Sequence, residues 1–149
     1  MRHYIYKVYA LILAFTVTSC ESYLINGDLD GFWQLQTVEH LNSGEITHHN
    51  NDAFYAFQRH IIQLTRQTES HVMGQMGTRY HAEFCWQNDS IEIGEFREYD
   101  LYGCKKKVPS AVLEQFGFFQ ENTIFYVENL DKKSLILTSE DARIVLRKY

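Results

Sequence analysis

Residues 81–97 read HAEFCWQNDSIEIGEFR, two runs of alternating apolar and polar side chains on either side of Asn88-Asp89. Ala82, Phe84 and Trp86 fall on one face of the first run. Because successive side chains of a strand point to opposite faces, this alternation predicts a β-hairpin with one buried face. The turn residues between the runs favour a tight antiparallel connection.

Similar short runs, rich in aromatic and β-branched residues, continue along the chain in both directions. The run at 54–65 is long enough for one bent strand, or for two strands broken near Arg59-His60. The first run places Trp33, Leu35 and Thr37 on one face. Regular spacing of this kind is typical of a β-barrel or sandwich. Besides the hairpin, strands are expected at 31–39, 54–65, 72–77, 123–129, 134–139 and 142–148.

One segment departs from the strand pattern and predicts a short helix over 109–116. Pro109 suits a first helical turn, and Val112, Leu113 and Phe116 make an apolar stripe that Gly117 ends. We therefore expect an all-β fold of about eight antiparallel strands, a barrel or a sandwich, with one short helix. A barrel of eight strands has an interior that side chains fill or that holds one small ligand.

Composition restricts the class of protein. A chain of 149 residues with 45% apolar and 22% charged residues has room for one globular domain. The net charge of −5 at pH 7 argues against nucleic acid as a partner, because phosphate binding needs clustered basic side chains.

The first residues indicate export and a lipid anchor. Arg2 and Lys7 precede an apolar run over 8–17, which is too short to span a bilayer and suits a signal peptide. The run ends in Val17-Thr18-Ser19-Cys20, which resembles the bacterial lipobox. This resemblance implies cleavage before Cys20 and lipidation of its thiol. We expect a signal peptide at 1–19, a lipidated tether at 20–30 and a barrel domain at 31–149. The protein would then lie in the bacterial cell envelope, on either face of a membrane.

Three segments of the barrel domain resemble one protein family. They are Gly31-Phe32-Trp33, residues 55–64 (YAFQRHIIQL) and residues 144–149 (IVLRKY). Together they are similar to the lipocalin-like domain lipoproteins of Bacteroidetes, over nearly the whole mature chain. The resemblance implies that the fold is a calycin-type, antiparallel up-and-down (lipocalin-like) barrel of about eight strands, and it implies no particular activity.

The same resemblance implies how one end of the barrel closes. In lipocalins a tryptophan of the first strand closes that end, and a basic residue late in the last strand packs across it. Gly31 and Trp33 supply the first-strand part here. An antiparallel last strand would bring Arg147 near Trp33, which predicts a guanidinium over the indole ring. Gly31, Trp33 and Arg147 are therefore expected to be structural residues.

The aromatic side chains are the candidates for ligand binding. A small apolar or amphipathic molecule would bind between the strands against an apolar lining. The alternative is that these rings fill the barrel, whose outer surface and polar insert at 99–108 then dock another envelope protein. The candidate lining residues are Phe54, Phe57, Tyr80, Phe84, Trp86 and Phe125.

Other polar residues give weaker indications. Cys85 and Cys104 could form a disulfide in an exported protein, and the sequence leaves this open. His48-His49 and the run Lys105-Lys106-Lys107 are expected in solvated loops, and neither predicts a metal or lipid site. No catalytic motif is present, so we expect no enzyme activity, no catalytic residue and no cofactor.

Overall fold

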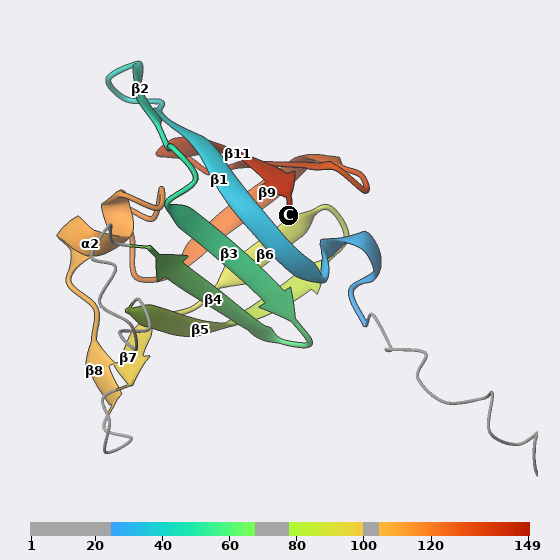
Figure 1. Ribbon diagram of the computed structural model, residues 1–149, viewed down its shortest axis with the longest axis horizontal. Helices are drawn as coiled ribbons and strands as arrows, with labels where there is room; N and C mark the ends of the chain where they lie inside the picture. Colours follow the sequence, from blue (N-terminus) through green and yellow to red (C-terminus); the bar gives the residue numbers. More distant parts are fainter. Residues whose placement is uncertain (1–24, 68–77, 100–104) are drawn as a thin grey trace, which may run out of the picture.

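A computed structural model describes residues 25–67, 78–99 and 105–149 of the chain (Figure 1). Almost all of the regular structure in these segments is β-strand. A 3₁₀ turn, η1 (Gly27–Leu29), precedes the sheet, and a five-residue helix, α2 (Ser110–Glu114), interrupts it. The strands are β1 (Gly31–His40), β2 (Glu45–His48), β3 (Ala53–Gln58), β4 (Ile61–Arg66), β5 (Arg79–Gln87), β6 (Ser90–Ile93), β7 (Arg97–Tyr99), β8 (Lys105–Lys107), β9 (Thr123–Leu130), β10 (Ser134–Thr138) and β11 (Ala142–Lys148).

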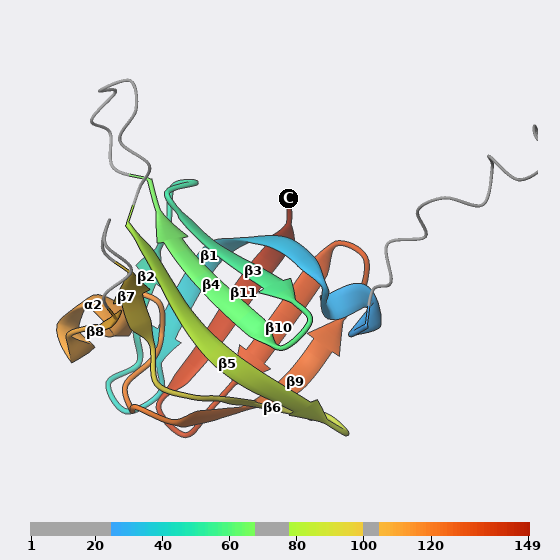
Figure 2. The ribbon, with the colours of Figure 1, turned by 90° about the horizontal axis from the view of Figure 1, so that it is seen from below.

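Eight of these strands close into an antiparallel barrel. Around the barrel they run β4-β3-β1-β11-β10-β9-β6-β5, and β5 pairs with β4 to complete the ring. When only these eight strands are counted, each lies beside the strands that precede and follow it along the chain, which is the up-and-down order that the family resemblance implies. β2 pairs with β1, while β7 and β8 extend from β5. Figure 2 shows α2 at one end of the barrel and η1 at the other.

Tight turns explain where several strands begin and end. Residues 54–65 form two strands, because the chain reverses at Arg59-His60 with Arg59 at a φ of 57°. The hairpin of β5 and β6 is confirmed, with Asn88 at a φ of 54°, but its second arm is interrupted at 94–96 before β7 resumes the pairing with β5. Lys105–Lys107 form an exposed strand rather than the predicted loop. The strand expected at 72–77 lies outside the described residues.

A bulge in β1 changes which side chains enter the core. Trp33 and Leu35 are buried as predicted, but the register with β11 shifts between Leu35 and Thr37. One extra residue reverses the alternation of a strand. Val38 is therefore buried in place of Thr37, which is only partly buried.

The chain enters the barrel interior directly after α2. The Phe118 amide donates to the Leu113 carbonyl (3.1 Å), and the Gly117 amide donates to the Glu114 carbonyl (2.9 Å). This pair of bonds is a Schellman motif, which needs a residue with positive φ, and Gly117 has a φ of 81°. The turn directs Phe116 and Phe118 into the core, where both are at most 2% exposed.

Candidate functional site

Aromatic rings fill the α2 end and the middle of the barrel. The ring of Phe118 lies 4.8 Å from that of Phe96, 5.3 Å from that of Phe125 and 6.0 Å from that of Tyr55, between centroids. The Tyr55 hydroxyl donates to the Phe116 backbone carbonyl, which ties the segment after α2 to β3. These buried rings pack against one another in the interior of this part of the barrel.

The η1 end of the barrel carries a hollow of about 950 Å³, which we call the mouth. Its apolar wall comes from β3 and β5, which place Phe57, Phe84 and Trp86 there. The polar groups of its rim come from the residues on either side of η1 and from the β3–β4 turn. The mouth is lined by Ile25, Asn26, Asp30, Gly31, Phe32, Ala56, Phe57, Gln58, Arg59, His60, Phe84, Cys85 and Trp86.

Three of the six predicted aromatic residues line the mouth, namely Phe57, Phe84 and Trp86. Phe125 is fully buried against Phe118, in the filled part of the barrel.

The other two predicted aromatic residues lie away from the mouth. Tyr80 packs near the ring of Phe116, at a centroid distance of 6.4 Å. Phe54 was expected to line the ligand site, but its ring lies against Tyr149 and Phe32. Since Tyr55 enters the core, strand alternation turns Phe54 to the outer wall.

Trp86 brings an unpaired hydrogen-bond donor to the mouth. Its indole nitrogen Nε1 is buried and has no partner within the described part of the chain. The rim itself is well organised, because the Asn26 side chain donates to the Arg59 carbonyl (2.7 Å) and to the Asp30 carboxylate (2.6 Å). The mouth therefore combines apolar walls with polar groups at fixed positions.

Trp33 and Lys148 close the barrel beside the mouth. The Trp33 indole donates to the Leu29 carbonyl (2.8 Å), and Lys148 Nζ lies 4.2 Å from the Trp33 ring centroid. The ammonium also donates to the Asp28 and Asp30 carbonyls, at 2.8 and 2.6 Å. Burial lowers the pKa of Lys148, against the opposing effect of the two aspartates.

The prediction that Arg147 packs over Trp33 was wrong by one residue. Trp33 pairs with Lys148 across β1 and β11, whereas Arg147 pairs with Gln34 and donates to its side-chain oxygen (2.5 Å). Neighbouring residues of a strand face opposite sides, so the shift moves Arg147 off the closure. Gly31 lies at the closure, as expected. Its φ is 126°, and Lys148 Nζ is only 3.0 Å from the position that a Cβ would occupy.

The residues before β1 belong partly to the domain rather than to the predicted tether at 20–30. Leu29 is fully buried, and Asp30 is 7% exposed and accepts hydrogen bonds from Asn26. Ile25 and Asn26 line the mouth, and the polar composition of this segment gave no sign of that role. Cys20 and Cys104 lie outside the described residues. Cys85 is exposed at the mouth, and its disulfide with Cys104 stays a prediction.

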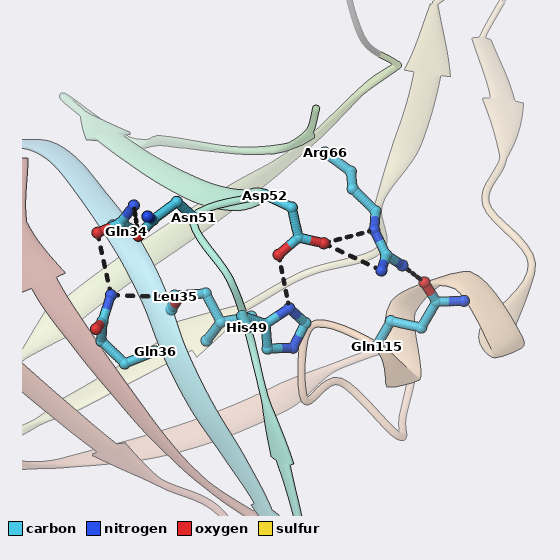
Figure 3. A network of polar contacts seen from close by, with 8 residues as sticks. All are labelled: Gln34, Leu35, Gln36, His49, Asn51, Asp52, Arg66 and Gln115. Carbon is cyan, nitrogen blue, oxygen red and sulfur yellow. Dashed lines mark hydrogen bonds and ion pairs between the residues drawn. The ribbon is translucent and has the colours of Figure 1, made fainter. Parts of the chain in front are cut away.

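A second polar cluster lies at the α2 end (Figure 3). Asp52 stands between His49 and Arg66, with its Oδ1 3.3 Å from His49 Nδ1 and its Oδ2 3.1 Å from Arg66 Nη2. The Arg66 guanidinium also donates to the Gln115 side chain. The His49 side chain is 4% exposed, so its predicted place in a solvated loop was wrong. The hydrogen bond to Asp52 holds it against the barrel, whereas His48 stays exposed in β2.

Stability is expected to depend on pH through His49. Burial lowers the pKa of this imidazole below 6.5, and it outweighs the opposing attraction of Asp52. The unfolded chain then takes up the proton first, so the stability from neutral His49 is complete above about pH 6.5 and falls as the pH drops below it. Urea unfolding between about pH 7 and pH 5 should show a smaller loss for His49→Gln than for the wild type. His48→Gln should follow the wild-type profile, and parallel profiles for all three proteins would contradict the assignment.

Within the described segments, no cluster of three or more His, Cys, Asp or Glu side chains has an arrangement suited to a metal ion. Nor does any helix there have the length and apolar character needed to cross a membrane.

Comparison with known proteins agrees with the barrel geometry. The family model of the lipocalin-like domain matches residues 13–149. A lipocalin-like protein from Bacteroides uniformis ATCC 8492 is similar in structure, with a TM-score of 0.59 and 23% identity over 83% of this chain and 100% of that one. An uncharacterized protein from Bacteroides eggerthii DSM 20697 has a TM-score of 0.60 and 20% identity, over 81% of this chain and 99% of that one. No curated protein matches the chain.

Proposed function

Because the chain belongs to the lipocalin-like domain family, we propose that it is a binding protein that takes a small apolar or amphipathic molecule into the mouth of its barrel. The observation that carries the proposal is the combination of Phe57, Phe84 and Trp86 in one open hollow. Small-molecule sites are concave, mostly apolar and supplied with a few placed polar groups. The filled interior limits the ligand to this end of the barrel.

Trp86 favours an amphipathic ligand over a purely apolar one. A buried donor without a partner costs about 1–3 kcal/mol, which a ligand with a hydroxyl, carbonyl or carboxylate oxygen can recover. Arg59 on the rim adds a cation for an acidic head group. A ligand with a short apolar part and an oxygen-bearing head fits both features.

Fluorescent-probe titration of residues 21–149 tests the proposal. We expect a hydrophobic probe to bind saturably and to be displaced by lipids extracted from the envelope. Trp86→Ala should weaken binding about tenfold, which corresponds to about 1.4 kcal/mol of lost contact. Tyr126→Ala is the matched control, because Tyr126 is an aromatic side chain of β9 that is 63% exposed and lies outside the mouth. Equal effects of the two substitutions, or no saturable binding by folded protein, would contradict the proposal.

We further propose that Cys20 carries the lipid that holds this protein on a membrane of the bacterial cell envelope. The charged head, the apolar run and the lipobox-like ending of residues 1–20 support this. Two or more acyl chains are needed for durable attachment, because a single chain gives only reversible binding.

The filled barrel interior supports a second candidate function, that of a protein-docking module. β7 and β8 form a ribbon that projects beside the barrel (Figure 1), and Lys105–Lys107 are exposed on it. An envelope protein with an acidic surface would suit this ribbon. Cross-linking in cells would distinguish the two functions, since deletion of residues 99–108 should abolish partner capture only if the ribbon docks a protein.

A further inference from the structure

Four exposed apolar side chains gather around the mouth and form what we call the mouth patch, namely Ile25, Phe32, Ile61 and Tyr149. Their exposed fractions are 65%, 46%, 37% and 80%. Phe32 links them, because it lines the mouth with Ile25 and also a neighbouring outer groove with Ile61. Tyr149 joins through Phe54, whose ring lies 6.3 Å from that of Phe32 and 5.6 Å from that of Tyr149. Contiguous exposed apolar surface of this kind marks an interaction site.

The start of the described chain places this patch next to the proposed anchor. Ile25 follows Cys20 by five residues, which span at most about 18 Å when fully extended. The mouth and η1 lie at the same end of the barrel, whereas α2 lies at the other end (Figure 2). A lipid on Cys20 would therefore hold the mouth patch near the membrane surface.

We infer that the mouth patch lies on the lipid bilayer that carries the anchor, so that the mouth opens onto the membrane. Exposed Arg59 at the tip of the β3–β4 turn suits the phosphate layer, while Phe32 and Tyr149 suit the interface below it. The inference rests on the proposed anchor, and it deepens the proposed function by making the bilayer the source of the ligand. The ligand class that follows is a single-chain lipid.

Quenching by brominated lipids tests this orientation. The full chain is acylated in the expressing cells and reconstituted into vesicles of phosphatidylethanolamine and phosphatidylglycerol with brominated acyl chains. The chain has two tryptophans, so Trp86→Phe leaves only the buried Trp33 as background. A reporter is then added in the patch as Phe32→Trp, or on the far wall as Ile124→Trp.

Ile124 is the matched control position. It lies in β9 and is 52% exposed, close to the 46% of Phe32. In the ring, β11 and β10 separate β9 from β1, and Ile124 is not one of the residues that line the mouth. We expect bromolipid quenching of the Phe32→Trp reporter to be at least threefold that of the Ile124→Trp reporter. Equal quenching at the two positions, or none at Phe32→Trp, would overturn the inference.

Two further measurements separate this inference from its premises and from a different occupant. We expect the Cys20→Ser variant to be absent from the vesicle fraction. If this variant still binds the vesicles, both the anchor and the inference are overturned. Probe binding is measured on the wild-type chain in the same vesicles, so that saturable binding by the wild type without quenching at Phe32→Trp overturns only the orientation. Self-association without vesicles that Phe32→Glu abolishes and Ile124→Glu does not would assign the patch to a second copy of the chain and would also overturn it.

Discussion

Replacement of Phe118 by alanine is expected to lower the free energy of unfolding by about 3–5 kcal/mol, the usual cost of removing a fully buried phenyl ring. Phe118 is 2% exposed, and its ring contacts rings from three other parts of the barrel, in Tyr55, Phe96 and Phe125. The substitution removes all three contacts and leaves a cavity that the closed sheet cannot collapse to fill. Urea unfolding followed by circular dichroism gives the change directly.

Phe119→Ala is the control for this substitution. Phe119 is the next residue, is only partly buried and contacts His40 at a centroid distance of 4.9 Å. Its replacement should cost about 1 kcal/mol. The Phe118→Ala cavity should also bind benzene, at an interior site that the wild type lacks. Equal losses for the two variants, with no additional benzene site in Phe118→Ala, would show that Phe118 does not fill the barrel.

Replacement of Gly117 by alanine is expected to cost about 2–4 kcal/mol, because two penalties add. A positive φ disfavours a residue with a Cβ by about 1 kcal/mol, and Gly117 has a φ of 81°. The new methyl group would lie 2.7 Å from Ile144 Cδ1 and 3.3 Å from Val38 Cγ1, and overpacking of a core costs about 1–3 kcal/mol. Thermal and urea unfolding measure the sum.

Alanine substitutions at two other glycines distinguish the backbone penalty from the packing penalty. Gly44 has a φ of 71° and open space around it, so Gly44→Ala should cost about 1 kcal/mol from the backbone alone. Gly94 has an ordinary φ and 3.6 Å to its nearest neighbour, so Gly94→Ala should change stability by less than about 0.5 kcal/mol. If Gly117→Ala costs no more than Gly44→Ala, the contact with Ile144 yields freely and the segment after α2 is loosely held.

Much of the barrel could be predicted because its strands alternate in the sequence. The hairpin at 81–97 and the burial of Trp33 follow from local alternation and from turn residues, whereas the closed up-and-down order was implied by the family resemblance of three segments. Register does not follow from such patterns. The bulge in β1 buries Val38 in place of the predicted Thr37. The pairing of β1 with β11 differs by one residue from the predicted one, so Lys148 and not Arg147 lies over the Trp33 ring. Both differences arise from pairing between distant strands, which alternation within one strand cannot specify.

The candidate site was predictable in its wall and not in its rim. Phe57, Phe84 and Trp86 are inward residues of clear strands, so their common placement could be expected. Ile25 reaches the mouth beside Arg59 and His60, and the hydrogen bond from Asn26 to the Arg59 carbonyl ties the segment before η1 to the β3–β4 turn. A polar tether and a turn carry no pattern that predicts such a contact.

The pairing of β1 with β11 gives the barrel a single long-range seam. Gln34 and Arg147 meet across it although 113 residues separate them. Each of the other seven junctions joins barrel strands that follow one another along the chain. During folding, β1 keeps one unpaired edge until β11, the last strand of the chain, pairs with it. Unpaired edges recruit other strands, so the period before the seam closes is when this protein is most prone to aggregate.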